Sequence, residues 1–283
     1  MKHLLEILGV SRQALHQRVN RQLQAESRDR LIIEKAHAIR ERHPRMGCRT
    51  MHILMRPLEI GRDRCEQLLL SNGLRLKRYK SPFKTTQSQH IYKFPDLIQG
   101  TCIRQINRVW QTDITYFFAQ NNDVFYMVFI EDIYSRRIIG YGAFDHMRAE
   151  ANLACLNQAF RVRKGHSLQG LIHHSDYGGQ YIDKEYLTAL RARNIKISMC
   201  SQAWQNAYTE RINGIVKNDY LKAWNIVVLT DLQRALVKGV NAYNHEKPHG
   251  SLPDKMSPVQ FEEYLKRTPS RSHPKLKIYQ YEK

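Results

Sequence analysis

The sequence has few acidic residues for its number of basic ones. Its 26 Asp and Glu stand against 45 Lys and Arg, which gives a formal net charge of +19. A surface this basic attracts polyanions, and nucleic acid is the default candidate. Residues 1–100 hold 20 basic and 9 acidic side chains, so the excess is densest in the first third of the chain. Solvated faces normally mix both signs, which disfavours a purely solubilising role.

The chain also lacks a cysteine framework and long apolar runs. Its 5 cysteines are scattered, odd in number and never spaced as C-x-x-C. This pattern favours reduced thiols and excludes a disulfide frame or a zinc knuckle. No N-terminal stretch has the length of a signal peptide, and no run approaches a membrane span. We therefore expect a cytoplasmic protein without a membrane partner, located where DNA is.

The first segment, residues 1–22, resembles a helix-turn-helix. A short apolar helix is expected to end at Gly9, and Ser11 is suited to cap the next helix. Side chains of that second helix, including Gln13 and Arg18, would point outward in the recognition position of this motif. We therefore expect both of them to contact DNA.

Residues 23–88 predict a second basic helical unit, with helices separated near Pro44 and Gly73. A run of four cations follows the last of these helices, at a place suited to phosphate contacts. These predicted DNA-binding residues are Arg75, Lys77, Arg78 and Lys80. The polar stretch 89–102 has no periodicity and is expected to be an interdomain linker.

Residues 103–265 predict an α/β domain. Two successive hairpins make three antiparallel strands, and helices and strands then alternate. This is the element order of the ribonuclease H-like fold, a mixed five-stranded sheet with flanking helices. A helix is expected near 149–162 and another, long one over "QNAYTERINGIVKNDYLKA". Residues 266–283 would form a basic C-terminal tail.

Three acidic residues lie at positions that suggest a functional role for their charge. Asp113 lies inside an otherwise apolar strand, where an unpaired carboxylate is costly. Asp176 ends a later strand before a glycine loop, the place where open α/β sheets hold ligands. Glu210 lies on the long helix. Each alone fits a structural role, but their combination in this order favours a site for two Mg²⁺ (or Mn²⁺) ions that catalyses phosphoryl transfer.

The helix that carries Glu210 presents two further polar residues on the same face. Asn206 and Lys217 lie four residues before and seven residues after it. We expect both to contact DNA near the carboxylates. For Lys217 a solvated helix position is the competing interpretation.

Five ordered segments carry a family resemblance: "WQTDITYF", "IEDIYSRRIIGY", "IHHSDYGGQY", "NAYTERINGIVKNDY" and "AYNHEKPHGSL…SPVQF". They are similar to segments of IS-three family insertion-sequence transposases of the OrfB type, with a DDE core like that of retroviral integrases. The resemblance implies a bacterial, nucleoid-associated enzyme whose catalytic, metal-binding residues are Asp113, Asp176 and Glu210. It also implies that Lys217 contacts transposon-end DNA.

The same resemblance implies a reaction and partners. DNA strands are cleaved at the element's ends by water, and the freed 3′ hydroxyl attacks another phosphodiester. The protein is expected to form a homo-oligomer on DNA and to work with the upstream OrfA product, or fused to it. One departure is the spacing of 33 residues between Asp176 and Glu210, where the family more often has two more. We interpret it as a loop deletion that leaves the site in place.

Two other functions compete with the transposase. A catalytically inactive DNA-binding regulator would use the helical N-terminal part alone, and a ribonuclease H-like nuclease would act on other substrates. Asp132 is not expected in the metal site and is assigned a structural role, paired with Arg136 or Arg137. The adjacent His173 and His174 should point to opposite faces of a strand, which disfavours a shared zinc ion.

Overall fold

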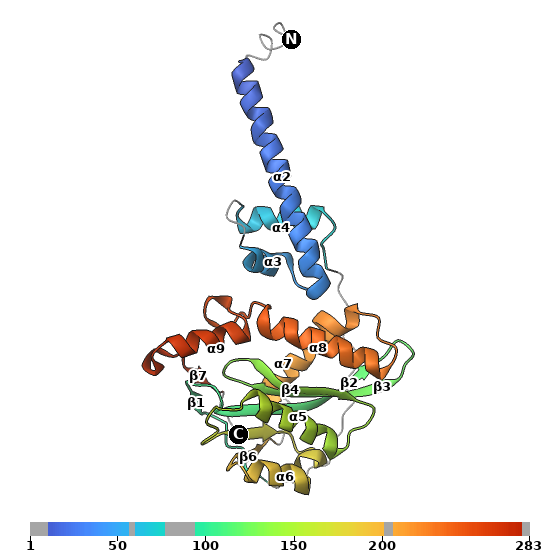
Figure 1. The fold of residues 1–283 in the computed structure, drawn as a ribbon, viewed down its shortest axis with the longest axis vertical. Coiled ribbons are helices and arrows are strands. Elements are labelled where there is room, and N and C mark those ends of the chain that lie inside the picture. Colours follow the sequence, from blue (N-terminus) through green and yellow to red (C-terminus); the bar gives the residue numbers. More distant parts are fainter. Residues whose placement is uncertain (1–10, 57–59, 77–93, 201–205, 279–283) are drawn as a thin grey trace. The chain divides into compact units, whose positions relative to one another are not determined.

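The computed structural model describes residues 11–56, 60–76, 94–200 and 206–278 (Figure 1). The chain divides into two compact units, Met1–Tyr79 and Lys80–Lys283, and each is described by itself. Among the described residues, no helix combines the length and apolar character that crossing a membrane requires.

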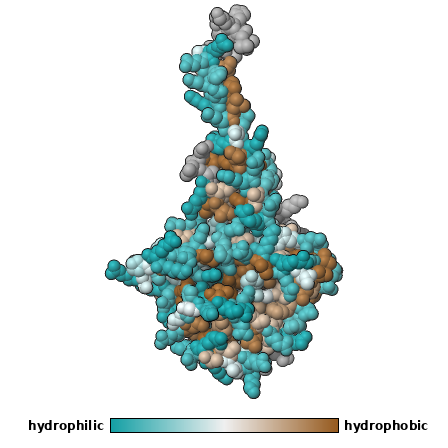
Figure 2. Space-filling view, in the orientation of Figure 1, coloured by the Kyte–Doolittle hydropathy of each residue, from teal (hydrophilic) through white to brown (hydrophobic). Residues whose placement is uncertain are grey.

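The N-terminal unit consists of helices α2 (Arg12–Arg42), α3 (Cys48–Met55) and α4 (Arg62–Ser71). Only the C-terminal half of α2 joins their common core. The buried residues are Ile32, Ala36 and Ile39 of α2, with Met51 of α3 and Cys65 and Leu69 of α4. Nearer its start, α2 carries a line of exposed apolar side chains that Figure 2 shows along the helix, Leu15, Val19 and Leu23.

The structure confirms one expected feature of this region and corrects another. Ser11 caps α2, since its Oγ accepts a hydrogen bond of 3.0 Å from the backbone N–H of Ala14. The expected boundary after residue 22 is wrong, because α2 continues without a break to Arg42. No glycine or proline interrupts that stretch, so nothing local stops the helix. The apolar helix expected before Gly9 lies outside the described residues.

The second unit is built on a five-stranded mixed sheet of strand order β4-β3-β2-β5-β6. The long strands β2, β3 and β4 pair antiparallel, while β5 and β6 run parallel to β2. Their bounds are Val109–Phe118 for β2, Val124–Asp132 for β3, Arg137–Phe144 for β4, Ile172–Ser175 for β5 and Lys196–Met199 for β6. This order and the flanking helices confirm the ribonuclease H-like fold.

Helices cover both faces of the sheet (Figure 1). Helix α5 (Ala149–Val162), found where the sequence predicted it, and α6 (Lys184–Arg191) pack on one face through a core around Trp110 and Leu156. Helices α7 (Ala207–Ile215) and α8 (Leu229–His245) cover the other face. The long helix expected around Glu210 changes character after α7, into a π-helical turn, Val216–Tyr220, and a short 3-10 turn.

The C-terminal segment belongs to this unit. Helix α9 (Pro258–Arg267) extends past the predicted boundary at 265, and β7 (Leu276–Lys277) pairs antiparallel with β1 (Cys102–Ile103). Ile278 is buried beside them. Within the predicted basic tail, the described residues up to 278 are held against the end of the sheet by apolar side chains.

Asp132 has the expected structural role, with a different partner. Its carboxylate meets the buried guanidinium of Arg163 on α5 at 3.1 Å, and not Arg136 or Arg137. Arg163 also binds Glu262 of α9 at 2.6 Å, so one guanidinium joins two buried carboxylates from β3 and α9. Burial would raise the pKa of Glu262, but the hydrogen bonds and charge of Arg163, with the charge of Arg137 and the Ser135 hydroxyl, hold that pKa below its ordinary value. This network fixes α9 to the sheet.

Candidate active site

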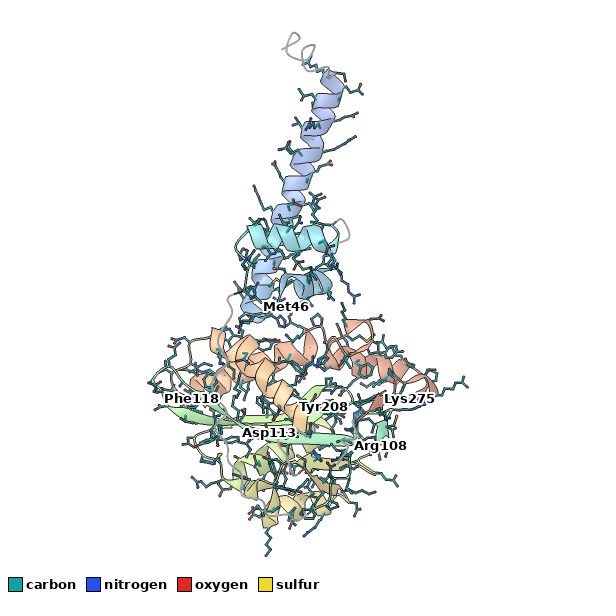
Figure 3. The ribbon with its side chains drawn as sticks, turned by 180° about the vertical axis from the view of Figure 1, so that it is seen from behind. Met46, Arg108, Asp113, Phe118, Tyr208 and Lys275 are labelled. Atoms are coloured by element: carbon teal, nitrogen blue, oxygen red, sulfur yellow. The ribbon has the colours of Figure 1, made fainter. Side chains whose placement is uncertain are left out.

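Asp113 lies in the middle of β2, on the face that α7 covers (Figure 3). Alternate β2 residues point to this face. Gln111 Oε1 accepts a hydrogen bond from the backbone N–H of Thr209, and Asn213 Nδ2 donates to Asp113 Oδ2. The strand therefore places one carboxylate directly beneath the helix that carries Glu210.

Asp176 is brought next to Asp113 by strand register. In the parallel pair, Gln111 lies opposite His174, and the two aspartates each follow two residues later. Asp176 Oδ1 accepts a 3.1 Å hydrogen bond from the backbone N–H of Gly178, which orients the carboxylate at the strand end. Burial raises the pKa of Asp176.

The charge of Asp176 acts on Asp113. Burial first, then the charge of Asp176 and, more weakly, that of Glu210 raise the pKa of Asp113 to about 8, against the hydrogen bond from Asn213. Two neighbouring carboxylates repel each other when both are ionised, so the pair favours a cation between them. Oxygen ligands of this kind are the ones that hard divalent ions prefer, so the donor set fits such an ion.

Glu210 faces this pair from the first turn of α7 and is exposed. Its charge reaches Asp113, as the pKa of that residue records. Among the described residues, however, no group of three or more His, Cys, Asp or Glu side chains lies close enough together to hold a metal ion. The structure therefore brings Asp113 and Asp176 together and places Glu210 on the same side, but not close enough to complete a metal site with three ligands. Residues 201–205, which lead into α7, are outside the described residues.

Lys217 and Asn206 both bond to β2. Lys217 Nζ donates to Thr115 Oγ1 at 2.7 Å and to the Tyr116 carbonyl at 3.2 Å, and burial lowers its pKa. Asn206 is buried, and its Nδ2 donates 3.1 Å to the Thr112 carbonyl. That burial contradicts the expected DNA contact of Asn206, because its amide anchors the start of α7 to the strand.

Asn213 was missed by sequence reasoning. It lies three residues after Glu210 on the same side of α7, a spacing that could have identified it. Its Nδ2 holds Asp113, while its buried Oδ1 has no hydrogen-bond partner. A buried acceptor left without a partner is uncommon and marks a place where a ligand atom or water can bind.

The predicted DNA-binding residues of the N-terminal unit are described only in part. Gln13 and Arg18 are exposed on α2, and Arg75 is exposed after α4. Lys77, Arg78 and Lys80 lie outside the described residues. The three described side chains are accessible to a polyanion.

The adjacent histidines do not join the carboxylates. His173 Nε2 pairs with the Tyr186 hydroxyl and His174 Nδ1 with the Ser198 hydroxyl, each at 2.9 Å. Burial lowers the pKa of His173 to about 3 and that of His174 to about 4. Both are therefore neutral packing residues of β5 with different partners.

Two family models described as an integrase core domain match the chain, over residues 104–203 and 193–258. Together they span more than half of the 283 residues and contain all three acids of the candidate site. The matched region coincides with the sheet and the helices that cover it.

Curated relatives extend the similarity beyond this region. The insertion element IS600 uncharacterized 31 kDa protein of Shigella sonnei is 29% identical over 92% of this chain and 97% of that protein. The transposase for insertion sequence element IS629 of Shigella sonnei is 26% identical over 83% of this chain and 80% of its own. Transposase InsF for insertion sequence IS3A of Escherichia coli K12 is 27% identical over 55% of this chain and 54% of that protein.

Solved structures of similar fold include retroviral integrase core domains. The catalytic core of HTLV-2 integrase, in complex with magnesium, has 18% identity and a TM-score of 0.44, covering 59% of this chain and 98% of that one. The core domain of BIV integrase has 17% identity and a TM-score of 0.42, covering 57% and 99%.

Proposed function

This chain belongs to the integrase core family and is a DDE transposase of the insertion-sequence type, and from that membership we propose that Asp113, Asp176 and Glu210 are its catalytic residues. The observation that carries the proposal is the convergence of Asp113 and Asp176 at the parallel β2–β5 pair, with Glu210 facing them from α7. In the proposed reaction, DNA strands at the element's ends are cleaved and the freed 3′ hydroxyl attacks target DNA.

Activity in this family depends on divalent metal ions, and we assign two Mg²⁺ (or Mn²⁺) ions to these carboxylates. Such ions activate an attacking oxygen and stabilise a leaving oxygen in phosphoryl transfer. The protein's own share is to hold the ligands. Asn213 orients Asp113, and the Gly178 N–H orients Asp176. Asn206 fixes the start of α7, and with it the position of Glu210.

The family acts on DNA and assembles into oligomers. For this chain we propose a homo-oligomer on transposon ends, joint action or fusion with an upstream OrfA product, and a place at the bacterial nucleoid in the cytoplasm. We propose that residues 1–88 bind DNA, that 89–102 link the two parts, and that catalysis resides in the unit that follows. The net charge of +19 supports a polyanionic partner.

The proposed DNA surface of the N-terminal unit predicts a salt effect. Arg18→Ala and Arg75→Ala in the full chain should each weaken binding of all DNA sequences and reduce the slope of log affinity against log salt by about 1, because each cation neutralises one phosphate. Fluorescence anisotropy across a salt series measures this slope. Arg161→Ala, an exposed position on α5, is the matched control. Unchanged slopes for both variants would refute these two contacts.

Lys217 predicts a different effect. We expect Lys217→Ala to weaken binding of transposon-end DNA and to reduce cleavage, without rescue by raised metal concentration, because its ammonium lies beside β2 near Asp113. Loss of a phosphate contact should affect all sequences equally, whereas loss of a base contact should cost the cognate end about 1–3 kcal/mol more. The exposed Lys222→Ala is the control. If Lys217→Ala binds and cleaves transposon ends normally, the role of Lys217 is only structural, through its hydrogen bonds to β2.

The two alternatives make opposite predictions for the same assays. A regulator binds the ends and cleaves nothing, and a nuclease cleaves without joining. No observation on the described residues favours either, so the transposase is retained.

A further inference from the structure

A pocket lies at the same α7 helix but away from the three acids. Its volume is about 280 Å³ including the open mouth. Side chains from the end of β3, the turn after it, α7, α8 and the loop that follows form its walls. The lining residues are Glu131, Arg136, Tyr208, Arg211, Ile212, Ile215, Tyr243 and His249.

Helical geometry separates this pocket from the active site. At 3.6 residues per turn, Tyr208, Arg211 and Ile215 lie on the flank of α7 opposite Glu210. Glu210 shares its flank with Asn213, which holds Asp113. Figure 3 shows Tyr208 near the start of α7, over the strand that carries Asp113. The pocket is therefore distinct from the carboxylate site but is lined by the same helix.

The pocket contains a buried carboxyl group, one oxygen of which has no hydrogen-bond partner in the described part of the chain. Glu131 is 1% exposed, and its Oε2 makes no hydrogen bond. Burial raises its pKa to about 8, while the charge of Arg136 opposes the rise. No ion pair within 4.0 Å reaches Glu131 from the described residues. A buried carboxyl group normally has partners, so this one is suited to receive a donor from a ligand in the pocket.

The mouth of the pocket is aromatic and cationic. The guanidinium of Arg136 lies 4.4 Å from the centroid of the Tyr208 ring. Arg211 is exposed beside them. Arg136 adopts a backbone φ of 64°, in the left-handed region that a non-glycine residue seldom occupies. Arg136 closes the turn between β3 and β4, where its backbone N–H donates a 2.8 Å hydrogen bond to the Asp132 carbonyl, and its side chain lines the pocket.

These groups narrow the class of ligand. An acidic protein side chain would satisfy the two arginines but would bring a carboxylate toward Glu131. A lysine would form an ion pair with Glu131, but its positive charge would be repelled by the two arginines. A nucleotide carries both an anion and a hydrogen-bond donor on a flat ring, which matches the cations, the buried acceptor and the aromatic wall together.

We infer that this pocket binds one unpaired nucleotide of the DNA substrate. Its phosphate lies at Arg136 and Arg211, its base stacks against Tyr208, and an exocyclic amine of the base donates to Glu131. Adenine, cytosine and guanine carry such an amine and thymine does not, so the pocket discriminates against thymine. The inference rests on the proposed function in one respect, since it assumes that DNA passes along α7.

Calorimetry with the full chain tests this directly. The probes are the 5′-monophosphates of deoxyadenosine, deoxycytidine, deoxyguanosine and thymidine, titrated without metal at pH 9, above the Glu131 pKa of about 8, where its carboxylate only accepts hydrogen bonds. We expect the three amine-bearing nucleotides to bind more tightly than thymidine monophosphate. Tyr208→Leu should weaken binding roughly 5- to 150-fold through loss of stacking. Glu131→Gln should reduce or invert the discrimination against thymine, because an amide can donate to the thymine carbonyl.

Controls separate this pocket from general charge effects. Arg211→Ala should weaken all four nucleotides, whereas Arg234→Ala, an exposed arginine on α8, should change none. Arg211 is exposed and Tyr208 half-buried, so both substituted proteins should fold, which thermal melting checks. Absence of binding by the parent protein, or equal binding of all four nucleotides unaffected by Glu131→Gln, would overturn the inference.

The outcome is separable from that for the catalytic residues. Asp113→Asn should abolish cleavage and leave nucleotide binding unchanged, because Asp113 is on the other flank of α7. If DNA cleavage depends on Asp113 but no nucleotide binds, the nucleotide pocket is refuted and the proposed function stands. If nucleotides bind but Asp113→Asn does not affect cleavage, the pocket stands and the proposed catalytic role of Asp113 is refuted.

Discussion

Asp113→Asn, Asp176→Asn and Glu210→Gln should each abolish cleavage and joining of transposon-end DNA, with a loss on the order of 10³-fold or more. Each change removes the charge of a proposed metal ligand and little volume, and charge stabilisation by such ions is worth several kcal/mol in phosphoryl transfer. DNA binding should stay close to normal. Gel assays of end cleavage and a parallel binding titration measure the two quantities separately.

A surface carboxylate provides the matched control for this series. Glu263 is exposed on α9 and, among the described residues, pairs only with the neighbouring Lys266, so Glu263→Gln should leave cleavage unchanged. Near-normal cleavage by any one of the three variants would remove that residue from the catalytic set. Glu210→Gln is the most informative, because Glu210 is the exposed member that does not close onto the other two.

The second large effect concerns stability. Arg163→Met should lower the free energy of unfolding of the catalytic unit by about 3–5 kcal/mol, because it leaves the buried carboxylate of Asp132 without its cation and leaves Glu262 with Arg137 as its remaining arginine. Urea unfolding measures the loss. Lys266→Met removes an exposed ion pair instead and should cost about 1 kcal/mol or less. Equal stability of the Arg163→Met and parent proteins would show that α9 is held by packing alone.

The loss caused by Arg163→Met should depend on pH. In the parent protein the pKa of Glu262 is lowered, so its contribution to stability is present above the unfolded pKa of about 4.3 and is lost as pH falls through the folded value. Without Arg163, only Arg137 and Ser135 still oppose the effect of burial, so the pKa of Glu262 rises. The stability difference between the two proteins should therefore be largest near neutral pH and should shrink as the pH approaches 4. A constant difference across this range would contradict the electrostatic explanation.

Much of the fold could be predicted from local patterns. Helix α5 matches its expected bounds, and Ser11 caps α2 as its side chain suggested. Both follow from near-neighbour chemistry. The continuous α2 was missed because residues 1–22 were interpreted as a helix-turn-helix and separated from the next unit, although no helix breaker stands after residue 22. The partner of Asp132 was missed for a different reason: Arg163 lies 31 residues away, and only the packing of α5 brings it near.

The site was predictable to a similar depth. Strand position and the order of motifs identified Asp113 and Asp176, and strand register then placed them side by side. Burial was not readable from the same patterns, so Asn206 was assigned to DNA although it anchors α7 to β2. The pocket around Glu131 was equally hidden, because its walls come from segments between 131 and 249 that only the tertiary fold assembles.

One measurement tests the central claim most directly. The full chain is incubated with labelled duplex DNA from the flanks of its own gene, with Mg²⁺ or Mn²⁺, and with the Asp113→Asn protein in parallel. We predict strand cleavage at the element's end that exposes a 3′ hydroxyl, followed by joined products, both absent from the Asp113→Asn reaction. End-specific binding with no cleavage at any metal concentration, or cleavage that survives Asp113→Asn, would contradict the assignment.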